Sequence, residues 1–167
     1  MSPIADEPAP AAATLRDARP EDRGAVIALF RGLQAFEREF EANRAPPGET
    51  DAHVDALLAW AAKGGCALLA EIDGRPVGLL IAGLTDDGPY VLPENRPHAQ
   101  VTDLFVAPEA RRRGLASAQI AEAERRFRAA GIRRMEIGVL APNAGARALY
   151  AAWSGGGPVH MTYAEAL

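Results

Sequence analysis

The chain has 167 residues, the size of one ordinary domain with a single hydrophobic core. Apolar residues make up 49% and charged residues 24%, a balance typical of a soluble globular protein. The net charge of -4 argues against general binding to nucleic-acid phosphates, and no run approaches the roughly 20 apolar residues of a membrane span. We therefore expect a cytoplasmic protein that binds neither nucleic acid nor membrane.

The first residues differ in composition from the rest. Residues 1–13 are rich in Ala and Pro and have no hydrophobic periodicity, so ordering them would bury too little apolar surface. We expect a disordered tail there and a single domain over residues 14–167.

Two helices are expected before most of the sheet. After a short strand at residues 14–18, Pro20 stands where a proline of the first helical turn belongs, and apolar residues recur every three or four positions as far as Phe40. A second helix is expected over residues 51–63, because Gly64 and Gly65 follow as a stop.

The middle of the chain predicts antiparallel strands. Residues 66–72 and 76–84 are apolar runs separated by Asp73 and Gly74, a strong signal for a two-residue hairpin turn. Residues 99–106 read as the next strand.

The last third predicts a crossover and a closing strand. An amphipathic helix over residues 115–130 and a strand over residues 132–140 form a unit in which the two flanking strands run parallel. A short helix at residues 143–153 and a last strand at residues 159–163 complete the prediction. The expected fold class is α+β, with a mixed, mostly antiparallel sheet and flanking helices.

One stretch carries the chemistry that the sequence indicates. It follows a strand directly and opens a helix, whose first amides lack intrahelical partners and attract anions. A glycine there lets backbone approach a ligand, and the arginines raise the local potential. The pattern suits a pyrophosphate, although a solvated basic turn would look the same, and it consists of Arg111, Arg112, Arg113, Gly114, Leu115, Ala116 and Ser117.

Two motifs together resemble a known family. The run from Val106 to Ala116 resembles the Arg/Gln-x-x-Gly-x-Gly/Ala motif of the GCN5-related N-acetyltransferase (GNAT) family. The later run from Asn143 to Tyr150 resembles that family's Asn-x-x-Ala-x-x-Leu-Tyr motif. The resemblance implies the acyl-CoA N-acyltransferase fold, acetyl-CoA as cosubstrate and an amine as acceptor.

The resemblance also implies roles for individual residues. Backbone amides of the first motif would bind the pyrophosphate of coenzyme A, and Asn143, with Ala146 of the same motif, would lie along the pantetheine arm. Tyr150 would lie beside the sulfur as general acid for the leaving thiolate. A splayed strand would supply a backbone amide to the developing oxyanion from Leu104, Phe105 or Val106.

The general base is only weakly indicated. Asp103 lies on the strand that runs toward the cofactor, and His98 has a pKa suited to proton transfer. Glu94 is a weaker candidate, and water is the alternative to all three. Glu37, with neighbouring glutamates at the end of the first helix, either forms a solvated face or attracts a cationic amine.

Other features limit or leave open the function. We expect no metal, because the three histidines are scattered and Cys66 is the only cysteine, which favours a buried thiol. Trp153, Ser154 and Gly155 stand where the family usually has Leu-Gly-Phe, so the chain departs from the family's pattern at the residues that follow the second motif. The acceptor, a small molecule or a peptide, is not identified. A non-catalytic acyl-CoA sensor and a homodimer remain open alternatives.

Overall fold

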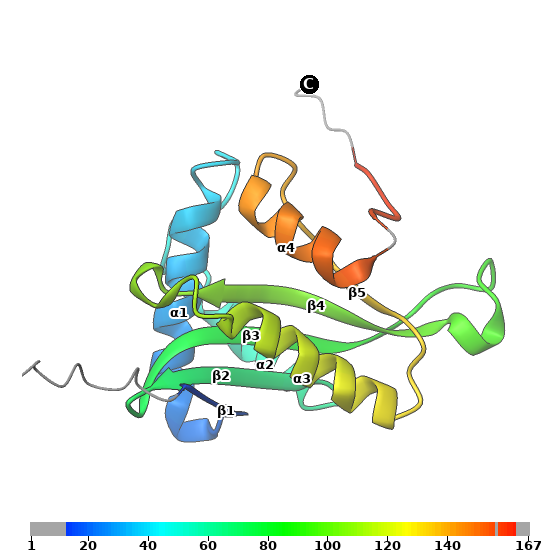
Figure 1. Ribbon diagram of the computed structural model, residues 1–167, viewed down its shortest axis with the longest axis horizontal. Coiled ribbons are helices and arrows are strands. Elements are labelled where there is room, and N and C mark those ends of the chain that lie inside the picture. Colours follow the sequence, from blue (N-terminus) through cyan, green and yellow to red (C-terminus); the bar gives the residue numbers. More distant parts are fainter. Residues whose placement is uncertain (1–12, 156, 163–167) are drawn as a thin grey trace, which may run out of the picture.

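A computed structural model describes residues 13–155 and 157–162. Its five strands follow one another across the sheet in chain order, with four helices between or after them. The elements are β1 (Ala13–Asp17), α1 (Arg23–Glu37), α2 (Asp51–Ala61), β2 (Cys66–Ile72), β3 (Arg75–Asp86), β4 (Pro97–Val106), α3 (Leu115–Ala129), β5 (Met135–Ile137) and α4 (Ala144–Ser154) (Figure 1).

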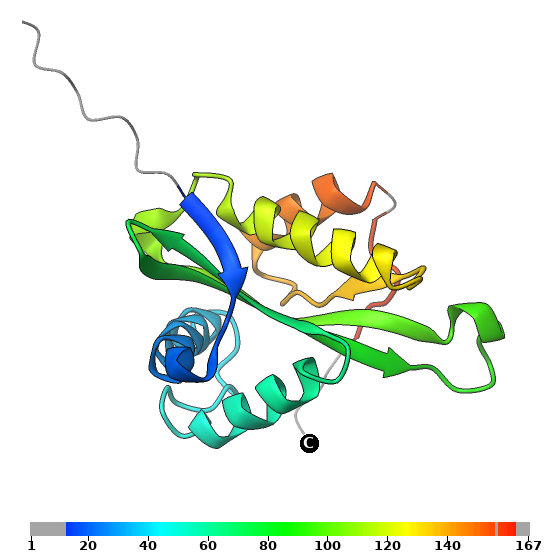
Figure 2. The same cartoon turned by 90° about the horizontal axis from the view of Figure 1, so that it is seen from below.

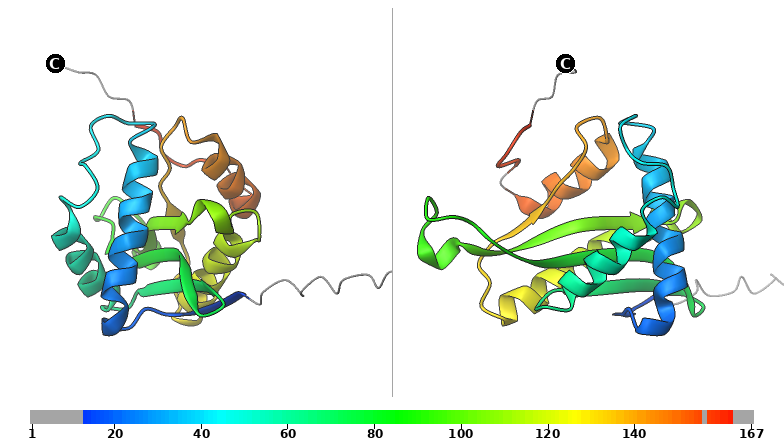
Figure 3. Two further views of the ribbon diagram at one scale, coloured as in Figure 1. Left: turned by 90° about the vertical axis from the view of Figure 1, so that its left-hand side faces the viewer. Right: turned by 180° about the vertical axis from the view of Figure 1, so that it is seen from behind.

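The sheet is mixed, as the sequence predicts. Strands β1 to β4 pair antiparallel, and β5 joins β4 in parallel after the α3 crossover. Helices α1 and α2 cover one face of the sheet, while α3 and α4 cover the other (Figures 2 and 3). The predicted α+β fold class is therefore confirmed.

Each face of the sheet carries its own hydrophobic core. Leu69, Leu79 and Ile81 point toward α1 and α2, whereas the alternate positions Leu68 and Leu80 point toward α3. All five of these side chains are fully buried. Because both faces of the central strands are covered, these strands read as continuous apolar runs in the sequence.

The β2–β3 turn has the predicted form. Asp73 and Gly74 have φ angles of 52° and 72°, and positive values at both central positions define the primed turn whose twist matches an antiparallel hairpin. The predicted hairpin is confirmed.

Two predicted strands differ from the structure. The strand expected over residues 132–140 is only three residues long, because its backbone separates from β4 after Ile137. The strand expected over 159–163 is wrong over residues 159–162, which have no strand pairing. Pro158 lacks a backbone donor, and Gly155 and Gly157 take left-handed φ angles of 63° and 81° that interrupt extended backbone.

The predicted tail falls mostly outside the described residues. Ala13, which the prediction placed in that tail, is instead the first residue of β1 and pairs with Ile72. No helix in the described part of the chain is long and apolar enough to cross a bilayer.

Gly65, between α2 and β2, packs closely against the backbone of β3. A Cβ atom at this position would lie 2.1 Å from the carbonyl oxygen of Ala82, so the backbone of β3 would have to move. We expect Gly65→Ala to lower the free energy of unfolding by about 1–3 kcal/mol, the range for overpacking. Thermal unfolding measures this. Gly24→Ala is the control, since its Cβ meets nothing within 4 Å and alanine favours helix; equal stability of the two variants would contradict the packing.

Candidate active site

A cleft of about 570 Å³ opens at the end of the sheet where β4 and β5 separate. The C-terminal end of α1 and the N-terminal end of α4 both contribute to its lining, and Figures 1 and 3 show these two helix ends near each other on the same side of the molecule. Its lining comes from α1, β4, the start of α3, the segment after β5, and α4, so residues far apart in sequence meet there.

The separation of β4 from β5 creates this cleft. The parallel pairing covers only three residue pairs and stops at Val101 and Ile137, while β4 continues to Val106. Residues 102–106 therefore have no β5 partner in the part of the chain that the structure describes. Leu104, Phe105 and Val106, the predicted sources of an oxyanion donor, all line the cleft.

The start of α3 forms one end of the cleft. Gly114 is the N-cap with a left-handed φ of 75°, and Arg112 also has a positive φ of 63°. The first helical hydrogen bond runs from the Ala118 amide to the Gly114 carbonyl, so the amides of Leu115, Ala116 and Ser117 precede any i-to-i−4 bond. These three residues line the cleft, and this end therefore carries the positive end of the helix dipole.

The three arginines of the motif differ in their surroundings. Arg111 donates from Nε to the Val106 carbonyl at 3.0 Å, and its guanidinium stacks 4.7 Å from the Phe36 ring centre. It therefore joins the end of β4 to α1. Arg112 lines the cleft together with Gly114, whereas the exposed Arg113 lies outside the cleft lining.

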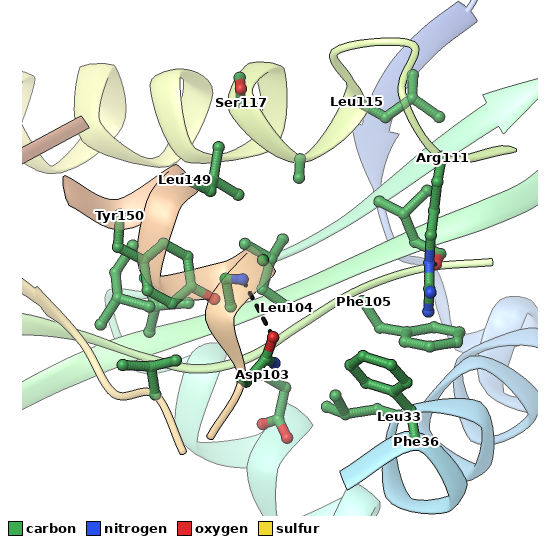
Figure 4. A pocket seen from close by; sticks show the side chains of 18 of the residues that line it. Leu33, Phe36, Asp103, Leu104, Phe105, Arg111, Leu115, Ser117, Leu149 and Tyr150 are labelled. Atoms are coloured by element: carbon green, nitrogen blue, oxygen red, sulfur yellow. Dashed lines mark hydrogen bonds between the residues drawn. The ribbon is translucent and has the colours of Figure 1, made fainter. Parts of the chain in front are cut away.

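Helix α4 places the second motif on the opposite wall. The Asn143 side chain caps this helix by accepting a hydrogen bond from the Ala146 amide at 3.1 Å. Both residues line the cleft. Tyr150, two turns along, directs its hydroxyl into the cleft toward Leu104 (Figure 4).

Tyr150 is protonated under ordinary conditions. Burial raises the pKa of its phenol to about 12, and the negative charge of Glu37 adds to the shift. A phenol in this state can donate a proton or a hydrogen bond but does not lose its proton spontaneously.

Two carboxylates face the cleft from the side opposite α3. Asp103 comes from β4 and Glu37 from the last turn of α1. Burial raises the pKa of Asp103, opposed by a hydrogen bond from Thr102. Burial also raises the pKa of Glu37, where Arg44 acts in the opposite direction and Asp103 adds to the increase. Both groups are thus easier to protonate than exposed carboxylates.

His98 is placed apart from these groups. It lies at the start of β4, outside the cleft lining, and is buried between Asp87 and Arg134. Its Nδ1 atom is 3.3 Å from an Asp87 carboxylate oxygen. We therefore do not propose His98 as a base. Glu94 lies in a short 3-10 turn of the β3–β4 connection, also outside the cleft lining.

Helix α1 contributes more to the cleft than the sequence predicts. Leu33 and Phe36 were expected only as a core face, yet they line the cleft (Figure 4). Glu37 was treated mainly as part of a solvated run, but it is half-buried. The sequence does contain a signal for this position. Leu33, Phe36 and Glu37 have the i, i+3, i+4 spacing of one helix face, so Glu37 lies on the same face as the two apolar residues.

Residues 32–155 match the model of the acetyltransferase (GNAT) family. The chain therefore belongs to this family. A comparison with curated protein sequences gave no significant match.

Solved structures with the same fold are distant in sequence. A GCN5-related N-acetyltransferase from Ralstonia eutropha JMP134 has a TM-score of 0.70 and 22% identity, with 92% of this chain and 99% of that chain covered. The aminoglycoside N-acetyltransferase AAC(6')-Iy in complex with CoA has a TM-score of 0.69 and 20% identity, with 95% of this chain and 98% of that chain covered. An aminoglycoside acetyltransferase from an uncultured soil metagenomic sample, in complex with sisomicin, has a TM-score of 0.69 and 17% identity, with 93% of this chain and 96% of that chain covered.

The raised pKa of Tyr150 can be measured in alkali. The native phenol holds its proton up to a pH of about 12, whereas an unfolded tyrosine loses its proton near 10. The native state therefore binds more protons between these values, and its stability falls as the pH rises through this window. We expect stability to decrease less steeply with pH in Tyr150→Phe. We also expect the phenol that ionises at the highest pH to disappear from an ultraviolet titration of this variant. An unchanged titration would contradict the buried position.

Proposed function

We propose that the protein transfers the acetyl group of acetyl-CoA to a primary amine by direct attack in a ternary complex. One observation carries the proposal: the free end of β4 lies between an anion-attracting helix start and a protonated tyrosine hydroxyl. Family membership supports acetyl transfer in general. The cosubstrate, the acceptor and the residue roles are inferred from the cleft.

The residues at the start of α3 fit a pyrophosphate. A Cβ atom built on Gly114 would meet no protein atom within 4 Å, so a ligand has room beside this turn. The amides of Leu115 to Ser117 supply donors, and Arg112 supplies charge from the same wall. The Asn143 oxygen caps α4, and its amide nitrogen has no hydrogen-bond partner among the described residues, so it can contact the pantetheine arm.

Acetyl-CoA supplies an activated thioester carbonyl. The protein must remove protons from the amine, supply a proton to the departing sulfur and stabilise the negative charge that develops on the carbonyl oxygen. The amine nitrogen bonds to the carbonyl carbon as the carbon–sulfur bond breaks. The backbone of residues 104–106 offers donors to the carbonyl oxygen. The departing sulfur takes a proton from the Tyr150 hydroxyl, whose raised pKa keeps that proton available.

Asp103 is the carboxylate that we assign as proton acceptor. An alkylammonium has a pKa of about 10.4 and must lose a proton before it can attack. Asp103 lines the cleft and has a raised pKa that makes it a better base than an exposed carboxylate. The nitrogen loses a second proton as the amide forms. One of the two protons returns through water to the Tyr150 phenolate and the other passes to bulk solvent, so the enzyme ends each cycle in its starting state.

The direct test is release of free thiol from acetyl-CoA across a panel of amines. Several structural neighbours are named as aminoglycoside acetyltransferases, so aminoglycosides belong in the panel beside amino acids, peptides and alkylamines. Acetylated product and thiol should appear in equal amounts. Tight binding of coenzyme A without acetylation of any amine would contradict the enzyme and favour the non-catalytic acyl-CoA sensor.

Gly114→Val tests the anion end of the cleft. A side chain there would occupy the space beside the turn, and each lost charge-assisted hydrogen bond costs about 1.5–3 kcal/mol, so coenzyme A should bind at least about tenfold more weakly. The φ of 75° adds a folding penalty of about 1–2 kcal/mol. Gly131→Val is the control, because Gly131 has a similar φ of 80° and equally open surroundings at the other end of α3. Calorimetric titration should show normal affinity for the control only.

Tyr150→Phe tests proton donation. The variant keeps the ring that packs against the core between the sheet and α3 but lacks the hydroxyl, so kcat should fall while the Kd of acetyl-CoA changes little. A fall of about 100-fold is expected for loss of a general acid. Single-turnover kinetics with separately measured binding separates the two effects. Full activity in Tyr150→Phe would remove Tyr150 from the mechanism.

A further inference from the structure

The charges lining the cleft are divided between its two ends. Arg112, Arg111 and the start of α3 make one end positive, with the Arg111 guanidinium over the Phe36 ring. Asp103 and Glu37 make the side away from α3 negative. A substrate that spans the cleft therefore meets opposite potentials at its two ends, and the end away from α3 favours a cation.

Asp103 lacks a counter-ion in direct contact. Its Oδ2 atom is buried and has no hydrogen-bond partner among the described residues. The carboxylate points away from Tyr150, toward the side of the sheet where α1 and α2 pack (Figure 4). A buried carboxylate oxygen without a partner is unfavourable, so a donor that enters the cleft gains a hydrogen bond that the protein leaves unmade.

A cation of the protein already occupies the neighbouring acidic position. Arg44, in the segment between α1 and α2, places Nε 3.0 Å from a Glu41 carboxylate oxygen and 3.5 Å from one of Glu37. The Arg44 side chain is 44% exposed, and exposed ion pairs of this kind contribute little net stability. A ligand cation can therefore replace this guanidinium at small cost.

From this arrangement we propose that the acceptor is a linear diamine or polyamine, whose second ammonium takes the place of Arg44 between Glu37 and Glu41. The inference rests on the proposed acetyl transfer and assigns its substrate class. The reacting amine lies between Tyr150 and Asp103, and the second charge of the same molecule lies at the outer acidic pair. Arg44 acts as an internal cation that competes with this second ammonium.

The test compares amines that differ only in the second charge. With acetyl-CoA saturating, kcat/KM for putrescine and spermidine should exceed that for butylamine by about threefold or more, the effect of one partly exposed ion pair. Lysine, which adds a carboxylate to the diamine, should be a poorer acceptor than putrescine. Equal rates for putrescine and butylamine would overturn the substrate class while leaving acetyl transfer intact. No transfer to any amine would instead remove the proposed function.

Two substitutions locate the second charge. Glu41→Gln should raise KM for putrescine but leave KM for butylamine and for acetyl-CoA unchanged. Glu39→Gln is the matched control, because Glu39 is exposed and loses the same charge two residues away. A uniform loss in both variants would mean that only the overall charge matters, which would overturn the assigned position.

Arg44→Met distinguishes a competitor from a ligand-binding group. If Arg44 competes with the second ammonium, KM for putrescine should fall by about threefold, in line with an exposed ion pair. If Arg44 instead binds a carboxylate of the acceptor, Arg44→Met should raise KM for lysine and leave putrescine unaffected, and this result would overturn the proposal. The comparison of wild-type rates holds even if a variant folds poorly.

Discussion

The early end of the pairing between β4 and β5 is the constraint on which the site depends. Three residue pairs hold the two strands together, and beyond Val101 and Ile137 they diverge. The divergence leaves free backbone on β4 in the interior of the fold, a position in which such groups are normally paired. Apolar walls from α1 and α4 surround this backbone, so polar groups there are placed for a ligand.

A polar cluster lies at the paired end of β4 and β5, before the divergence. Arg134 pairs with Asp87 just before β5, and its Nε lies 3.4 Å from a Glu136 carboxylate oxygen. His98 lies between them, with Nδ1 2.9 Å from the Arg134 guanidinium. Partly buried salt bridges of this kind add little to the free energy of unfolding, but they hold the groups that they join in one arrangement. The cluster therefore holds the short β5 against the start of β4 while the ends of both strands remain apart.

Local sequence signals predicted most of the fold, and long-range effects explain the misses. Asp73 and Gly74 define their turn by backbone preference alone, so the β2–β3 hairpin was predictable. The length of β5 depends on where a partner strand departs, and the apolar residues after Ile137 carry no mark of that departure. The motif residues near Gly114 and Tyr150 were found because both motifs are contiguous. The glutamate run that contains Glu37 was recognised, but its pairing with Arg44 was not, since their meeting depends on how the chain returns after α1.

The acidic end of the cleft depends on one extra residue in β4. The register of β4 against β3 shifts between Ile81 and Ala82, which leaves Thr102 as a bulge. In a regular strand Val101 and Asp103 would share a face. With the bulge, Val101 and Leu104 both pack on the α3 side, and Phe105 packs on the α1 side. A bulge that reverses the alternation just where β5 departs therefore turns Asp103 toward the side of Glu37. The same irregularity keeps the apolar Leu104 opposite Tyr150, so an acidic and an apolar wall come from adjacent residues of one strand.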